Sequence, residues 1–191
     1  MRAPICALLT TVVLLAAGPA RADAVHDRLP ACLACHGDKG QSTTPETPSL
    51  GAQQQAYAVT QLYMFREKLR KADIMNQMAE GLSDDDLRAL GEAISKLPAP
   101  PPAADAGDAA RIARAQALVG ANRCNACHTP NFAGQDQVPR IADQREDYLL
   151  RTLREYKSGA RTGYDATMAE VVAPLKDQDF ADLAYYLARV K

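Results

Sequence analysis

Two pairs of cysteines in this chain are each followed directly by a histidine, in the pattern Cys-x-x-Cys-His. These residues are Cys32, Cys35 and His36 in the first copy and Cys124, Cys127 and His128 in the second. Two thiols three positions apart on one helical turn can form thioethers with the two vinyl groups of a haem, and the histidine can then give an imidazole nitrogen to the iron. The repeated motif therefore predicts two covalently bound haem c groups.

Zinc is the other metal that paired cysteines commonly bind. Here the two pairs lie 92 residues apart, which is far beyond the spacing of a single zinc site. A histidine follows each pair, and the remaining cysteine, Cys6, lies in an N-terminal leader that is expected to be removed. The pattern therefore favours haem over zinc.

The first 22 residues have the features of a Sec signal peptide. Arg2 supplies a basic start, residues 5–17 are mostly apolar, and residues 20–22 read Ala-Arg-Ala, the small-x-small form of a cleavage site. The alternative is an uncleaved membrane anchor, but the apolar run is shorter than the roughly 20 residues that span a bilayer. We therefore expect a periplasmic protein whose mature chain has no transmembrane span.

The composition argues against nucleic acid as a partner and shows that the chain has few large aromatic side chains for its core. Removal of the leader leaves 20 basic and 23 acidic side chains, whereas a nucleic-acid-binding surface needs an excess of basic groups. The chain has no Trp, three Phe and seven Tyr, so its side chains alone would make a thin core. Two haems would supply the missing apolar bulk.

The two halves of the chain are related by an internal repeat. The haem motifs match at an offset of 92 residues, Pro48 matches Pro139 at 91, and Met75 matches Met168 at 93. Between the copies, four prolines in eleven residues favour a semi-stiff linker. We therefore predict a signal peptide over residues 1–22, one domain over 23–97, a linker over 98–108 and a second domain over 109–191.

Helical periodicity dominates both copies, and no convincing strand appears. Apolar residues recur at helical spacing over residues 57–70 and again over residues 147–158. A second helix in each copy is predicted over residues 84–97, where Ser83 is a good N-cap before three aspartates, and over residues 177–187. The sequence therefore predicts an all-α fold.

The segments ahead of the two haem motifs differ. A helix is predicted over residues 109–120, before the second motif. Only residues 23–31 precede Cys32 in the mature chain, and Pro30 is expected to interrupt them. The first domain is therefore expected to lack most of the helix that covers its haem, which would leave that haem more open.

A methionine at a matched position in each copy is the candidate for the second axial ligand of each iron. Met75 lies 39 residues after His36, and Met168 lies 40 residues after His128. A single methionine is most often core filler, but the matched position in both copies favours ligation. Histidine and methionine together would leave no open site on the iron and would raise its reduction potential, which indicates an electron carrier.

Other candidates for the first iron remain open. Met78 lies three residues after Met75 and would share its face on a helix, so it competes for the same role. Met64 falls within a predicted helix and is interpreted as packing. His26, which is ten residues from His36, is interpreted as a surface residue.

Three consecutive patterns recur in both copies over residues 31–188: Cys-x-x-Cys-His, Pro-x-Leu/Ile-x-x-Gln-x-x-x-Tyr and Met-x-x-x-Ala/Val-x-x-Leu-x-Asp-x-Asp. This order resembles class I cytochrome c domains of the cytochrome c4 type, and also the dihaem subunit of flavocytochrome c sulfide dehydrogenases. The resemblance implies a small all-α fold in each domain and haem c held by both Cys-x-x-Cys-His motifs. It also implies distal ligation by Met75 and Met168, and carbonyl groups of Pro48 and Pro139 that accept the imidazole N–H.

The leading hypothesis is a periplasmic dihaem protein that transfers single electrons and is not itself an enzyme. Its donor would be a dehydrogenase, a flavoprotein or a respiratory complex, and its acceptor a protein such as a terminal oxidase. It would act as a free shuttle or as the electron-transfer subunit of a flavin-containing dehydrogenase, and peripheral membrane association stays open. The alternative is a dihaem enzyme or gas sensor with one open iron.

Overall fold

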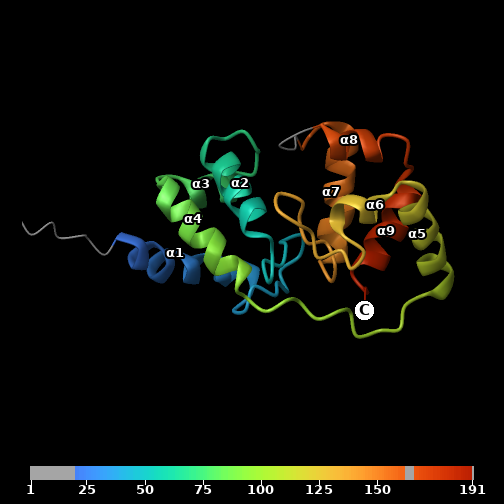
Figure 1. The fold of residues 1–191 in the computed structure, drawn as a ribbon, viewed down its shortest axis with the longest axis horizontal. Helices are drawn as coiled ribbons and strands as arrows, with labels where there is room; N and C mark the ends of the chain where they lie inside the picture. Colours follow the sequence, from blue (N-terminus) through green and yellow to red (C-terminus); the bar gives the residue numbers. More distant parts are fainter. Residues whose placement is uncertain (1–19, 162–165, 191) are drawn as a thin grey trace, which may run out of the picture.

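The computed structural model describes residues 20–161 and 166–190 (Figure 1). These residues form helices and loops without a β-strand, apart from one isolated bridge between Gln135 and Val138, so the predicted all-α fold is confirmed. The predicted leader, residues 1–22, lies almost entirely outside the described residues. Within the described part of the chain, no helix combines the length and apolar character needed to cross a membrane.

The first half contains four helices in the described range. They are α1 (Ala20–His36), α2 (Gln55–Arg66), α3 (Asp73–Ala79) and α4 (Asp84–Ser95). The start of α4 has the predicted cap: the Ser83 hydroxyl accepts from the Asp86 N–H, and the Asp86 carboxylate accepts from the Ser83 N–H at 2.8 Å. This capping box satisfies two backbone donors that the first turn of a helix would otherwise leave without partners.

The second half repeats this arrangement. Its described helices are α5 (Ala109–Ala121), α6 (Cys124–His128), α7 (Glu146–Ser158), α8 (Thr167–Val172) and α9 (Asp177–Leu187). The predicted longer helices lie within a few residues of α2, α4, α5, α7 and α9. The short helices α3 and α8 were not predicted as elements, because six or seven residues are too few to show a clear period. Figure 1 shows the two halves side by side, joined by a helix-free segment over residues 97–108.

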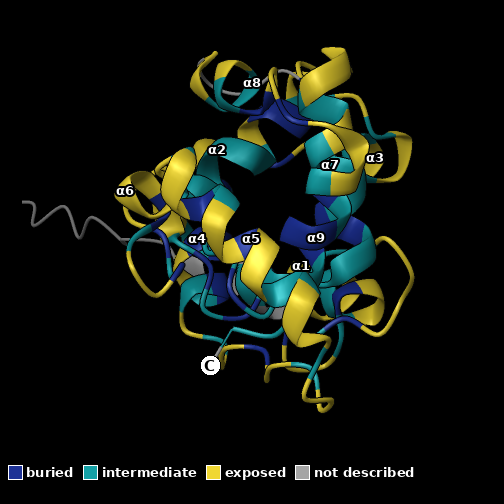
Figure 2. Ribbon diagram, turned by 90° about the vertical axis from the view of Figure 1, so that its right-hand side faces the viewer, coloured by how far each residue is buried: buried dark blue, intermediate teal, exposed yellow. Residues whose placement is uncertain are grey.

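Each half packs around a hydrophobic cluster of its own. Helix α4 packs against α1 and α2, and α9 packs in the same way against α5 and α7. Gly91 allows α4 to approach α2 closely, because an added Cβ would lie 2.6 Å from Cγ2 of Val59. The matching residue in α9 is Ala184, which is fully buried. Figure 2 shows the buried residues of α9 inside the second half.

One sequence-based prediction is wrong: the first half does have a helix ahead of its haem motif. Helix α1 runs through Pro30 and ends at His36, and it packs against α4. A proline inside a helix removes one hydrogen bond and crowds the preceding turn. The neighbouring Leu29 packs against the hydrophobic cluster of the first half, and such tertiary packing contributes most of a helix's stability. The first haem motif therefore follows a helix, as the second one does.

Asp182 is a buried carboxylate that ties α9 to α5. Its side chain is 2% exposed and accepts hydrogen bonds from Nε of Arg114 at 2.7 Å and Nε of Arg111 at 3.0 Å. The bond from Arg114 contributes most to lowering the pKa of Asp182, against the opposing effect of burial, and brings it to about 2. The paired carboxylate therefore stays charged in the folded protein at neutral and mildly acidic pH.

We expect Asp182→Asn to lower the free energy of unfolding by about 2 kcal/mol at neutral pH. The folded-state pKa of Asp182 is below its unfolded value, so this stabilisation is complete above about pH 4 and disappears as the pH falls through about 2. Thermal unfolding of the haem-loaded protein and the variant should therefore converge in acid. Asp85→Asn, which breaks an exposed pair with Arg88, is the control and should change little. A loss of stability in Asp182→Asn that is the same at all pH values would contradict this prediction.

Candidate haem sites

The first Cys-x-x-Cys-His motif occupies the last turns of α1. His36 is buried, and its Nδ1 lies 2.7 Å from the carbonyl oxygen of Pro48. A carbonyl only accepts, so Nδ1 carries the proton and Nε2 keeps a free lone pair. Burial lowers the pKa of His36, against the opposing effect of the Pro48 bond, so the ring is favoured in its neutral form, the form in which an imidazole can bind a metal. Cys32 is half-buried and Cys35 is exposed, and both thiols are free.

The second motif forms α6 and has the same geometry. His128 is buried, its Nδ1 lies 2.9 Å from the carbonyl oxygen of Pro139, and burial again lowers its pKa. Cys124 is half-buried and Cys127 is exposed, and both are free. Here the helix is interrupted before the motif, at Arg123, whose φ of 52° is left-handed. Each half therefore presents two thiols and one neutral imidazole, the set that covalent haem attachment needs.

The predicted axial methionines lie at equivalent places. Met75 is in α3 and Met168 is in α8, and each is half-buried against the hydrophobic cluster of its own half. Met78, one turn further along α3, is also half-buried, so it stays a competitor of Met75. Met64 is buried in α2. The side chain of His26 lies outside the described part of the structure.

A buried guanidinium group at the contact between the halves was not anticipated from the sequence. Arg161 is 4% exposed. It donates to the hydroxyl of Tyr57 at 2.8 Å and to those of Tyr148 and Thr152, both at 3.2 Å. Among the described residues no carboxylate pairs with it. A buried guanidinium group that donates to three hydroxyl groups is a favourable place for an anion, such as a haem propionate.

The electrostatic environment of Tyr148 also indicates that an anion would be stable beside Arg161. Burial raises the pKa of this phenol, but the guanidinium groups of Arg161 and Arg70 outweigh burial and lower the pKa below its ordinary value. A position where two cations favour ionisation of a phenol also favours a bound carboxylate. The sequence carried a signal for this cluster, because Tyr57 and Arg70 recur 91 residues later as Tyr148 and Arg161.

Comparison with known proteins identifies the family. The family model for cytochrome c matches residues 112–191. Cytochrome c4 of Thiocapsa roseopersicina is 34% identical over 179 residues, which cover 90% of both chains. The chain belongs to the cytochrome c4 family. It is a dihaem electron-transfer cytochrome with two covalently bound haem c groups, as the repeated motifs predicted.

Two further relatives of this cytochrome extend the comparison. The crystal structure of reduced recombinant cytochrome c4 from Pseudomonas stutzeri superposes with a TM-score of 0.77 at 27% identity, over 92% of this chain and all of that one. The thiosulfate dehydrogenase electron acceptor of Thiomonas intermedia (strain K12) is 30% identical over 194 residues, covering 96% of this chain and 89% of its own length. Both similarities extend over the two halves.

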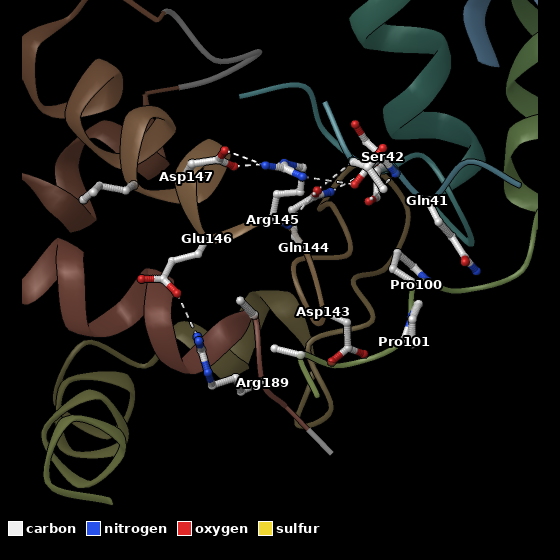
Figure 3. Close-up of a pocket in the computed structure, with 15 residues that line it drawn as sticks. Gln41, Ser42, Pro100, Pro101, Asp143, Gln144, Arg145, Glu146, Asp147 and Arg189 are labelled. Carbon is white, nitrogen blue, oxygen red and sulfur yellow. Dashed lines mark hydrogen bonds and ion pairs between the residues drawn. The ribbon is translucent and has the colours of Figure 1, made fainter. Parts of the chain in front are cut away.

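An open crevice of about 700 Å³ lies between the two halves, beside the segment that connects them. It is lined by Ser42 from the first half, Gln144 and Arg145 from the second, and Pro100 from the connection (Figure 3). Its charges are paired internally, as in the 2.6 Å contact of Arg145 with Asp147. No residue of either haem motif lines this crevice, so it is part of the contact between the halves and separate from the haem sites.

Proposed function

We propose that this cytochrome works in the periplasm and carries single electrons from a dehydrogenase to an acceptor such as a terminal oxidase. In this proposal the leader of residues 1–22 is removed, and domains over residues 23–97 and 109–191 are joined by a linker over residues 98–108. The observation that carries the proposal is the duplicated arrangement of a buried, neutral histidine bonded to a proline carbonyl. Two equivalent sites in one chain suit electron transfer between two haems.

The residues proposed to hold the two haems follow the repeat. The thioethers would form at Cys32, Cys35, Cys124 and Cys127. The proximal ligands would be His36 and His128, and the distal ligands would be Met75 and Met168. The bound haem iron supplies one-electron redox chemistry. The chain would contribute the rest, because the proline carbonyls orient both imidazoles, and a methionine bound to each iron would leave no position there for water or substrate.

A dehydrogenase donor is supported by one relative, whose name is thiosulfate dehydrogenase electron acceptor. The free carrier is favoured over a fixed subunit of a flavin-containing dehydrogenase. An uncovered first haem would favour a fixed subunit, because a partner could cover it, but α1 is present and packs on α4. A clean monomer after purification from the native host would support the free carrier.

Carbon monoxide binding tests the proposed ligation. We would reduce the mature, haem-loaded protein, record the carbon monoxide difference spectrum and count haem per chain in the same sample. Two haems and an unchanged spectrum are expected, because a methionine would occupy the sixth position of each iron. Binding of carbon monoxide at one haem would overturn the proposal and support the alternative, a dihaem enzyme or gas sensor with one open iron.

A further inference from the structure

Two buried glutamines connect the halves by the same pair of hydrogen bonds. Oε1 of Gln144 accepts from the N–H of Ser49 at 2.7 Å, and its Nε2 donates to the carbonyl of Ser49 at 2.9 Å. Gln53 of the first half binds Arg140 of the second in the same way, at 2.8 and 3.1 Å. Gln144 is 6% exposed and Gln53 is 8% exposed. Each half therefore holds one backbone residue of the other.

The peptide group that Gln144 binds is also the one that orients the first proximal histidine. The N–H of Ser49 and the carbonyl of Pro48 belong to the same peptide unit. That carbonyl lies 2.7 Å from Nδ1 of His36, while the N–H donates to Gln144. A continuous hydrogen-bonded chain therefore runs from the imidazole of the first half to the glutamine of the second.

The second half contains the mirror image of this chain. The carbonyl of Pro139 lies 2.9 Å from Nδ1 of His128. The N–H of the same peptide unit belongs to Arg140 and donates to Oε1 of Gln53 at 2.8 Å. The imidazole of the second half is thus connected to a glutamine of the first.

Hydrogen bonds in such a chain strengthen one another. A peptide whose N–H donates to an acceptor carries more negative charge on its carbonyl oxygen, by an amount that strengthens the next bond by roughly 10–30%. A stronger carbonyl acceptor makes the imidazole a more electron-rich iron ligand. An electron-rich ligand stabilises the oxidised iron, and second-shell hydrogen bonding is one of the terms that sets a haem potential.

We propose that Gln144 and Gln53 are positioning residues that act across the domain contact, each lowering the reduction potential of the haem in the opposite half. This inference rests on the proposed histidine ligation of both irons. It makes the two potentials depend on the docking of the halves, since separation would remove both glutamine acceptors. The proposed methionine ligands, Met75 and Met168, would bind the irons without using either glutamine.

The test compares two substitutions of Gln144 that both remove its Nε2 donor but have opposite effects on its acceptor. Gln144→Leu removes the acceptor, and Gln144→Glu keeps an acceptor oxygen and adds negative charge. Both potentials would be measured by spectroelectrochemical titration, with haem methyl NMR signals assigned to each domain. Gln144→Leu should raise the first haem's potential, changing its reduced-to-oxidised ratio by about twofold to fourfold. Gln144→Glu should lower that potential.

Gln54→Leu is the matched control. Gln54 also crosses the contact, because its Nε2 donates to the carbonyl of Ala133 at 2.9 Å, but it does not touch either proline peptide. It should leave both potentials unchanged, and Gln53→Leu should shift the second haem instead of the first. Shifts of the same sign for Gln144→Leu and Gln144→Glu, equal shifts at both haems, or an equal shift in Gln54→Leu would overturn the inference.

The experiment distinguishes failure of this inference from failure of the proposed function. Carbon monoxide binding by the unmodified protein would disprove methionine ligation, yet the potentials of the Gln144 variants would still report on the histidine side. Haem per chain, counted in every variant, shows that both histidine sites are loaded. A loaded protein whose first haem does not respond to either Gln144 substitution would disprove the inference alone.

Discussion

Replacing both Cys124 and Cys127 by alanine is expected to leave one covalent haem per chain, held in the first half. Thioether bonds need both thiols, and the two motifs lie on separate helices, α1 and α6. The second half should also lose most of its stability, because a chain with three Phe and no Trp has few large side chains to fill the space of an absent haem. Intact-protein mass and haem-to-chain ratio measure the first effect, and thermal unfolding measures the second.

Asn125→Ala is the control within the same motif. Asn125 is an exposed residue between the two cysteines, and its replacement keeps both thiols, so two haems per chain should remain. The reciprocal variant, with Cys32 and Cys35 replaced by alanine, should keep only the haem of the second half. Loss of both haems in either double variant would show that the halves do not mature independently.

Met168→Ala is expected to open the sixth position of the second iron. The reduced protein should then bind one carbon monoxide per chain, whereas the unmodified protein should bind none. The potential of the second haem should fall by on the order of 0.1–0.3 V, because a thioether favours ferrous iron and axial ligands together cover a range of about 0.8 V. The carbon monoxide spectrum and a redox titration measure the two effects.

Met64→Ala serves as the comparison, since Met64 is buried in α2 and is interpreted as packing. It should reduce stability by about 2–5 kcal/mol without carbon monoxide binding. In the first half, Met75→Ala and Met78→Ala would identify the ligand, because only one of them should open the iron. A Met168→Ala protein with an unchanged potential and no carbon monoxide binding would refute this ligand assignment.

The sequence by itself determined the chemistry of this protein and most of its helices. Both thiols and the imidazole of each site lie within five consecutive residues, such as Cys124–His128, so their spacing is set by local helix formation. The longer helices were predictable for the same reason, since apolar periodicity and caps such as Ser83 act over one or two turns. The repeat then indicated two sites of the same kind.

The tertiary structure decided what depends on packing between distant segments. The sequence predicts that Pro30 interrupts the segment before Cys32, but α1 packs against α4 and continues through this proline. Arg161 meets Tyr57 across 104 residues, and Gln144 meets Ser49 across 95. These pairs join one copy of the repeat to the other. A repeat in sequence relates equivalent positions, whereas which side chains meet across the two copies is set only when the folded halves dock.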